Sequence, residues 1–592
     1  MKPQSHNEIR SILLFIGLIL SASFLRADTA EDQKLNAFFQ EEWEWTLKQN
    51  PIYATLQGDL RYNDQIGDNS LAGILKQQEH SRETLKKLQT FDRSKLSSPN
   101  QLNYDLFLDQ TQAEVTGQQF PSYLMPVTQL GGLQQDAPQL AHFFPFDNTK
   151  EYEDYLSRLE KFPAAIDNAI LLLKRGLQEK ITPPKITLRD VGDQIKAQIV
   201  QNPEDSSFYD PFKKFPDTVA SADQEQLRNA ARTVLSQKVI PAYQRMYDYW
   251  IKDYSPNTRE SIGISALPNG AKWYAYLTHY HTTTDLTPEQ IHQLGLSEVK
   301  RIRAEMEKDI QDSGFKGSFD DWMKFLRTDP QFFYTKPEDL VNGYRDICKK
   351  IDPELPHLFG KLPRNSYGVR EIPAFSAPSQ TTAYYNEGNL RAGRPGWYFV
   401  NTYKLNTRPK WEMEVLSSHE AVPGHHLQIS LAQELENVPK FRTVSSYTAF
   451  VEGWGLYSES LGNEMGLYKD PYSKFGQLTY EMWRAVRLVV DTGIHTMGWD
   501  RQKAIDYFKA NAPKQESEII VEIDRYIVNP GQALAYKIGE LKIKELRKYA
   551  SDQLGDRFSI RDFHDHVLGN GAVPMPILEK QIKDWVAEEK KK

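Results

Sequence analysis

The sequence has little of what marks several protein classes. Its 592 residues include a single cysteine, Cys348, so no disulfide can form within the chain. The net charge is −7, and no basic arm with interleaved aromatic residues is present, so no nucleic-acid partner is expected. Beyond the N-terminal segment, no apolar run approaches the length of a membrane-spanning helix. Cys348 lies near the apolar side of a predicted amphipathic helix, which predicts a buried thiol and not a catalytic one.

The N-terminal segment has the order of regions found in a secretory signal. Lys2 and Arg10 precede an apolar run of about 14 residues, and the small residue Ala27 follows it. We therefore interpret residues 1–27 as a signal peptide and 28–592 as one exported domain, periplasmic or extracellular. Leu25 is a poor third residue before a cut after Ala27, so the cleavage point stays open and an uncleaved membrane anchor is the alternative.

Helical periodicity dominates the rest of the chain. It predicts helices over residues 29–50, over 149–179 with a bend at Pro163, and over 221–254. A further helix begins at Thr287 and Pro288 with Gln290 completing a capping box, and ends at Gly314. His292 lies on it among apolar neighbours and is interpreted as a packing residue.

One region departs from this helical pattern. Residues 367–405 are rich in glycine, proline, threonine and aromatic residues, and the runs "TTAYYN" and "GWYFVNT" are typical of strands. The fold class predicted is therefore mainly α, with a small β-sheet directly before the next motif.

That motif is "EVLSSHEAVPGHHLQISLAQ", which contains His419 and Glu420. Zinc peptidases commonly carry two histidines four residues apart, with a glutamate general base after the first. Here His425 and His426 follow six and seven residues after His419. Pro423 and the adjacent glycine should open the helix between them, so either histidine is a candidate second ligand. The alternative is that these histidines only cap a helix break.

A second stretch, "YTAFVEGWGLYSESLG", places Glu452 in an apolar run. A buried carboxylate is costly unless it is paired or binds a metal, so Glu452 is the candidate third ligand. Glu459 follows seven residues later on nearly the same helical face and is a candidate to support a ligand. A buried salt bridge from Glu452 to Arg484 or Arg487 is the alternative.

Four blocks occur in order: "HEAVPGHHLQ", "FVEGWGLYSE", "MWRAVRLVVDTGIH" and "NPGQALAYKIGELKI". Together they resemble the bacterial family catalogued as domain of unknown function 885. That family resembles zincin-type metallopeptidases with the helical fold of thimet oligopeptidase and angiotensin-converting enzyme. The resemblance implies a two-lobed helical protein with a small sheet beside the metal and a deep central cleft.

The resemblance also implies roles for the residues of the motif. His419, His425 and Glu452 are expected to hold one Zn²⁺ per chain, with His426 as the alternate second ligand and Glu420 as the general base. Another first-row metal is not excluded, because nitrogen and oxygen sites discriminate poorly among these ions.

Other residues are candidates for stabilising the transition state. Peptide hydrolysis builds negative charge on the carbonyl oxygen, which needs a donor. The resemblance to the glycine-rich loop and tyrosine helix of thimet-type oligopeptidases favours Tyr536, with His495 and Tyr526 behind it. Asp491, four residues before His495, is a candidate to orient that histidine or to hold Arg487. A helix is expected to begin near Gln532, after an extended or loop segment.

Substrate contacts are predicted from residue type and position. Cations suited to a substrate carboxylate are Arg394, Arg484, Arg487 and Lys537. "RPGWYFVNT" is predicted to be an exposed strand onto which an extended peptide adds, with Tyr398 and Asn401 as contacts.

The function predicted is zinc-dependent hydrolysis of peptide bonds in short peptides, of oligopeptidase or carboxypeptidase type. Two alternatives remain. One is hydrolysis of another amide, such as a cell-wall fragment, and the other is a non-catalytic periplasmic peptide-binding protein. The sequence gives neither the peptide end attacked nor the oligomeric state.

Overall fold

The computed structural model describes residues 29–374, 377, 380–390 and 393–592. The predicted signal segment lies outside these residues. The fold is mainly α-helical with one three-stranded mixed sheet, which confirms the predicted class. None of the helices in the described ranges combines the length and apolar character needed to cross a membrane.

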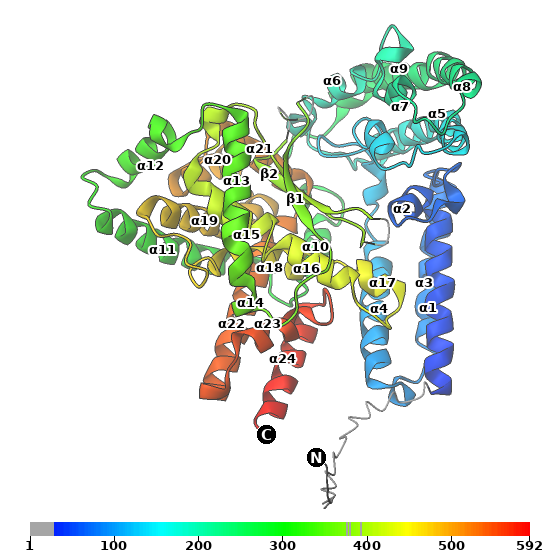
Figure 1. The fold of residues 1–592 in the computed structure, drawn as a ribbon. Helices are drawn as coiled ribbons and strands as arrows, with labels where there is room; N and C mark the ends of the chain where they lie inside the picture. The colour runs from blue at the N-terminus through cyan, green and yellow to red at the C-terminus, as the bar shows by residue number, and fades with distance from the viewer. Residues whose placement is uncertain (1–28, 375–376, 378–379, 391–392) are drawn as a thin grey trace, which may run out of the picture.

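The N-terminal helices form an upright group at one side of the molecule (Figure 1). They are α1 (Ala30–Gln49), α2 (Pro51–Leu56), α3 (Leu71–Leu88) and α4 (Ser98–Gly117). Thr29 and Asp32 cap α1 reciprocally, and Pro51 ends it as predicted while starting α2. Phe38 and Phe39 pack against Phe107 of α4, so this group has its own small core.

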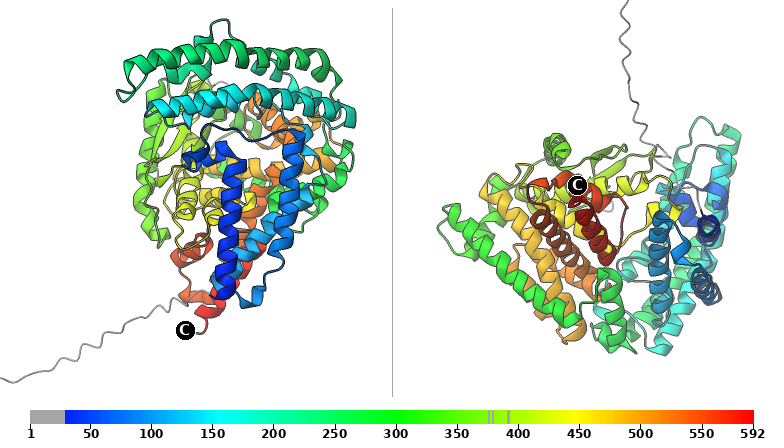
Figure 2. Two further views of the ribbon diagram at one scale, coloured as in Figure 1. Left: turned by 90° about the vertical axis from the view of Figure 1, so that its right-hand side faces the viewer. Right: turned by 90° about the horizontal axis from the view of Figure 1, so that it is seen from below.

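A second group, the upper layer, lies at the upper right of Figure 1 and runs across the top of the left view of Figure 2. It contains α5 (Thr149–Glu179), α6 (Val191–Lys196), α7 (Asp210–Lys213), α8 (Ser221–Val234) and α9 (Ile240–Tyr249). A π-helical segment, Leu235–Val239, joins α8 to α9, so the predicted long helix over 221–254 is continuous. Helix α5 contains Pro163 in its interior and is a single helix, where two segments were predicted.

The remaining elements form the body. Its helices before the sheet are α10 (Gly270–Thr282), α11 (Pro288–Asp312), α12 (Phe319–Thr328), α13 (Pro337–Ile351) and α14 (Leu355–Leu358). Those after it are α15 (Met413–Glu420), α16 (His425–Gln433), α17 (Lys440–Val444), α18 (Thr448–Ser460), α19 (Pro471–Thr496), α20 (Arg501–Asn511), α21 (Glu516–Val528), α22 (Ala535–Leu554), α23 (Ile560–Leu568) and α24 (Met575–Glu589).

Helices α11, α13 and α21 of the body bear on four sequence predictions. Helix α11 has the predicted capping box, and Gly314 beyond its end has a positive φ of 77°. His292 is buried and hydrogen-bonds the Thr492 hydroxyl at 2.8 Å, as expected of a packing residue. Cys348 is buried on α13, and burial raises the pKa of its thiol to about 12. The segment before Gln532 was expected to be extended or loop, but it is helix α21.

The sheet lies beside α13 and α15, with the strand order β1–β3–β2. The strands are β1 (Tyr367–Glu371), β2 (Ala383–Asn386) and β3 (Gly396–Val400), with β1 parallel and β2 antiparallel to β3. The predicted strand runs are therefore confirmed. The prediction that β3 offers an exposed edge is wrong, because both of its edges are already hydrogen-bonded.

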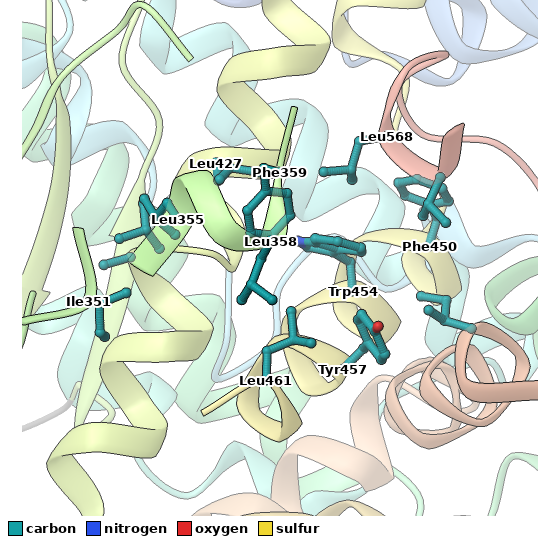
Figure 3. Close-up of a cluster of buried hydrophobic side chains, with 14 of the residues drawn as sticks. Ile351, Leu355, Leu358, Phe359, Leu427, Phe450, Trp454, Tyr457, Leu461 and Leu568 are labelled. Carbon is teal, nitrogen blue, oxygen red and sulfur yellow. The ribbon is translucent and has the colours of Figure 1, made fainter. Parts of the chain in front are cut away.

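An apolar cluster under the sheet fixes α18 against α14, α16 and α23 (Figure 3). Trp454 lies in its centre, between Phe359 and Tyr457. Its indole N–H donates to the carbonyl of Pro423 at 2.9 Å. This bond joins helix α18 to the turn that separates α15 from α16. It thereby fixes the positions of these three helices relative to one another.

Candidate metal centre

The predicted helix break is present at Ala421–Gly424. Helix α15 ends at Glu420 and α16 begins at His425. Pro423 has no N–H to continue the helix, and a Cβ on Gly424 would lie 1.8 Å from the His419 carbonyl oxygen. Only glycine allows this close approach of the chain, which starts a new helix directly beside the end of the old one.

The break brings three predicted ligands together. His419, His425 and Glu452 each offer one ligand atom, and these atoms all lie within 4.8 Å of one another. Glu452 Oε2 is 3.7 Å from His419 Nε2 and 3.5 Å from His425 Nε2. The described residues thus contain a possible metal site, built from the ends of α15 and α16 and the second turn of α18.

The distances fit a shared metal ion better than direct bonds. They exceed the usual hydrogen-bond range of roughly 2.7–3.2 Å. Metal–ligand bonds of about 2.0–2.2 Å in a tetrahedron place neighbouring ligand atoms about 3.3–3.6 Å apart. In addition, His425 Nδ1 is buried with no hydrogen-bond partner among the described residues, so this ring is not held by a network of its own. The donor set and its spacing fit a cation.

Glu459 supports the first histidine. His419 Nδ1 donates to Glu459 Oε1 at 2.8 Å, which leaves His419 Nε2 facing Glu452. Arg484 Nη2 lies 3.3 Å from the same Glu459 oxygen and pairs with that carboxylate. This is the arrangement in which a buried carboxylate orients a metal-binding imidazole. The predicted supporting role of Glu459 thus has a structural basis.

Gly455 fixes the ring of the same histidine from the other side. A Cβ there would lie 2.8 Å from His419 Cε1, so the ring packs directly against the α18 backbone. One turn of α18 thus carries the candidate ligand Glu452 and also the glycine on which the candidate ligand His419 packs.

The charges of this group depend on one another. Burial lowers the pKa of His419, but the carboxylates of Glu452 and Glu459 outweigh it and raise the pKa to about 9. Burial raises the pKa of Glu452, but the two histidines outweigh it and hold that pKa well below its usual range. Without a metal, the group is therefore stable as an ion pair of imidazolium and carboxylate. A bound metal ion would replace the protons on the imidazole nitrogens, because only deprotonated nitrogens can bind it.

Glu420 follows His419 at the end of α15. Its carboxylate makes no hydrogen bond or ion pair in the described part of the chain, and His419, His425, Glu452 and Arg484 all influence its pKa. Burial raises that pKa above its ordinary value. Glu420 is thus a partly desolvated carboxylate beside the triad, with free oxygens that can accept a proton.

His426 lies elsewhere. Its Nδ1 is 2.8 Å from the Tyr385 hydroxyl and its Nε2 is 3.2 Å from the Asn365 carbonyl oxygen. Burial lowers its pKa to about 4. With both ring nitrogens used against the sheet, the alternate ligand is not part of the site, and the structure places His425 there instead.

The three candidate oxyanion donors have different surroundings. His495 is buried, accepts from the Ile264 N–H at Nδ1 and donates to the Tyr526 carbonyl from Nε2, so neither nitrogen is free. The Tyr526 hydroxyl donates to Glu522 at 2.6 Å. Tyr536 accepts from Arg525 Nη2 at 3.1 Å and donates to none of the described residues, so its proton is available.

Asp491 does not orient His495. Its carboxylate accepts from the Tyr274 hydroxyl at 2.6 Å and from the Gly531 N–H at 3.1 Å. It thereby holds the turn that precedes α22. Burial raises the pKa of Asp491 to about 7.

The predicted substrate cations are largely engaged. Arg484 pairs with Glu459, and Arg487 with Glu522 at 3.0 Å. Neither pairs with Glu452, so the alternative salt bridge for that residue is absent from the described contacts. Lys537 is fully buried among three glutamates, all within about 3.1 Å: Glu298, Glu481 and Glu540. These residues stabilise the packing of α11, α19 and α22.

Three remaining candidates also have structural contacts. Asn401 donates from Nδ2 to the carbonyls of Ala377, Gln380 and Thr381, and so holds the loop before β2. Tyr398 is fully buried in β3 with its ring against Tyr344. Arg394 donates to the Leu56 carbonyl at 3.3 Å, at the edge of a cavity of about 1170 Å³ between the N-terminal helices and the sheet.

The sequence reasoning missed two kinds of residue. Arg525 was not considered, although it lies 11 residues before Tyr536 and holds its hydroxyl. The glycines of the "EGWG" run were noted without a role, although Gly455 packs on His419 and Gly453 packs on Gly539 of α22. Glycines beside a predicted ligand are the signal that a close contact is required there.

Comparison with known proteins gives the class of the chain. A model of the family described as bacterial protein of unknown function (DUF885) matches residues 51–582. The chain belongs to this family. No curated protein matches its sequence.

Two solved structures resemble it. One, described as a "putative lipoprotein" from Colwellia psychrerythraea, has a TM-score of 0.90 and 29% identity, over 95% of this chain and 100% of that chain. The other, a "putative lipoprotein of unknown function" from Shewanella oneidensis, has a TM-score of 0.64 and 18% identity, over 94% of this chain and 100% of that chain. The second shows a similar fold only. Neither description names a reaction.

Proposed function

We propose that this chain is an exported zinc-dependent peptidase that hydrolyses short peptides. The observation that carries the proposal is the gathering of His419, His425 and Glu452 with Glu420 unpaired beside them. Two imidazoles and a carboxylate with one position left open are the donor set of catalytic zinc. A zinc ion held there supplies a Lewis acid and an activated water.

The residues of the chain then have separate tasks. Glu420 accepts the proton of the attacking water and delivers it to the leaving amine, and burial, which raises its pKa, makes it a better proton acceptor. Tyr536 donates its free hydroxyl proton to the developing oxyanion. Arg525 Nη2 donates to the same hydroxyl at 3.1 Å and holds the phenol oxygen in place.

Export is supported by the N-terminal segment and by the relatives described as lipoproteins. Cys348 is the single cysteine of this sequence and is buried on α13, so it is not available as an attachment point for a lipid.

The test compares the wild-type chain with Glu420→Gln. We expect about one zinc per chain in both, with peptide hydrolysis reduced on the order of 10²- to 10⁴-fold in the variant because the general base is lost. Glu307→Gln, a surface glutamate paired with Arg303, is the matched control and should keep full activity. Wild-type protein that takes up no zinc, or a variant with unchanged turnover, would contradict the proposal.

The same pair of proteins separates the alternatives. A binding protein would bind peptides without turning them over, whether or not Glu420 is replaced. An enzyme for another amide would leave a peptide library intact and hydrolyse cell-wall fragments, with the same dependence on Glu420.

A further inference from the structure

A cavity of about 820 Å³ lies between the N-terminal helices and the body. Helices α3 and α4 form one wall, and α10 and the start of α18 form the other. Thr448, the first residue of α18, lines it. Glu452 is four residues later, so the two side chains lie on the same face of α18, about 6 Å apart along the axis. The lining of the cavity therefore includes a residue one helical turn from Glu452, a candidate metal ligand.

Aromatic rings line much of this cavity. Phe120 stacks on Trp273 with ring centroids 5.5 Å apart, and Tyr276 lies 5.4 Å from Phe120 and 5.9 Å from Tyr280. The Tyr276 hydroxyl donates to the Ala113 carbonyl at 3.0 Å, which joins α10 to α4 across the wall. Such faces attract organic cations through the ring quadrupole.

The charges on the lining have one sign. Asp109, Glu114 and Asp285 line the cavity, and no lysine or arginine does among the described residues. Asp109 and Glu114 form no ion pair in the parts of the chain that the structure describes, and Glu114 accepts a hydrogen bond from the Ser81 hydroxyl. Burial raises the pKa of Asp109, and the Tyr447 hydroxyl and the His279 ring act against that rise.

No lysine or arginine of the described residues forms an ion pair with these two acids. His279 is 59% exposed at the rim and lies 3.6 Å from Asp285. Arg82 reaches the wall from α3 but binds Glu79 and the Gln118 amide oxygen. Asp109 and Glu114 are thus left facing a space that is large enough for a side chain and walled by aromatic rings.

We propose that this cavity is the subsite for a basic residue of the peptide substrate, a lysine or arginine side chain within reach of the scissile bond. This assignment rests on the proposed peptidase function. The aliphatic stem packs on the rings of Trp273 and Tyr276, and the charged end pairs with Asp109 and Glu114. The N-terminal helices thereby take part in substrate selection, because Asp109 and Glu114 both belong to α4.

The experiment measures binding without turnover. The zinc-loaded Glu420→Gln chain is titrated by calorimetry with two series of short peptides that differ at one position, lysine against norleucine. We expect the best lysine peptide to bind on the order of tenfold or more tightly, with the difference lost in a background that also carries Asp109→Asn and Glu114→Gln. Glu83→Gln, an exposed residue of α3 outside the lining, is the matched control and should keep the difference.

The outcomes separate the two proposals. Equal affinity for lysine and norleucine peptides at every position would overturn the subsite, even if the wild-type chain hydrolyses both. A lysine preference that survives the double substitution would also overturn it, because the preference would then arise elsewhere. Binding with the expected preference, but no hydrolysis by the wild-type chain, would contradict the peptidase function and leave the cation site in place.

Discussion

Two adjacent histidines, His425 and His426, have opposite environments. His425 Nε2 faces Glu452, and its Nδ1 is buried with no hydrogen-bond partner in the described ranges. His426 bonds Tyr385 and Asn365 through its two nitrogens. The side chains of neighbouring helical residues point about 100° apart, so only one of them can face the site.

These environments predict different effects of removing each ring. His425→Ala should lose stoichiometric zinc, because one of three protein ligands disappears. His426→Ala should keep zinc but unfold at a lower temperature, because it leaves Tyr385 and Asn365 without their shared partner. Elemental analysis and thermal unfolding of both variants check this, and loss of zinc from the His426 variant alone would refute the assignment.

A second prediction at this scale concerns Glu459, which binds His419 but is not itself a ligand. Glu459→Gln keeps an acceptor oxygen but removes the charge that orients the imidazole and pairs with Arg484. We expect zinc affinity to fall about 10- to 100-fold, as for other groups that orient metal ligands. Competition with a zinc chelator measures it. Unchanged affinity would show that packing against Gly455 alone positions the ring.

At the scale of the elements, the turn between α21 and α22 depends on Asp491. Its carboxylate accepts from Gly531 N–H and from Tyr274, and Gly531 has a positive φ of 83° that suits glycine. This turn starts the helix that carries Tyr536. Asp491 therefore connects α19 and α10 to the position of the proposed oxyanion donor.

The pKa of Asp491 makes this connection dependent on pH. Burial raises the pKa to about 7 in the folded chain, above its unfolded value of about 3.9. The folded state thus holds the proton more tightly, and Asp491 contributes less stability as pH rises from about 4 to 7, by up to about 4 kcal/mol. Asp491→Asn lacks this titration.

Thermal unfolding of both proteins at pH 5 and pH 8 tests this. We expect Asp491→Asn to gain stability relative to wild type at the higher pH. Its amide oxygen can still accept from both Tyr274 and Gly531, since both bonds end on Oδ1. An unchanged difference between the two proteins across this range would contradict the raised pKa.

For the whole molecule, the metal centre joins elements that are distant in sequence. Its candidate ligands come from α15, α16 and α18, and Trp454, which lies on α18 with Glu452, anchors the apolar cluster of Figure 3. The N-terminal helices and the upper layer have separate cores. Metal binding should therefore stabilise the body directly, and should stabilise the N-terminal helices and the upper layer less.

A zinc titration tests this at the scale of the molecule. A ligand that binds only the folded state at 100 times its Kd adds about 2.7 kcal/mol to the free energy of unfolding. We expect zinc to raise the unfolding temperature of the wild-type chain and a chelator to reverse it, with no change in His425→Ala. An equal rise in that variant would place the bound zinc elsewhere.

Much of this arrangement was predictable from local patterns. The capping box of Thr287 and Gln290, the β-branched and aromatic runs of the sheet and the helix break at Pro423 each depend on residues close in sequence. The candidate ligands were predictable because a carboxylate such as Glu452 in an apolar helix demands a partner. The likeness to thimet-type peptidases and a cleft centred on the metal remain predictions.

The sequence by itself determined the helical class, the small sheet, the break after Glu420 and the short set of residues from which a metal site can be built. Only the tertiary structure decided that His425 and not His426 faces Glu452, that Asn401 and Lys537 hold other parts of the fold, and that Arg525 reaches Tyr536. The physical reason is that helix and strand preferences are local. The partner of a buried polar group, by contrast, is set by which distant helices pack against it, and that depends on the whole chain.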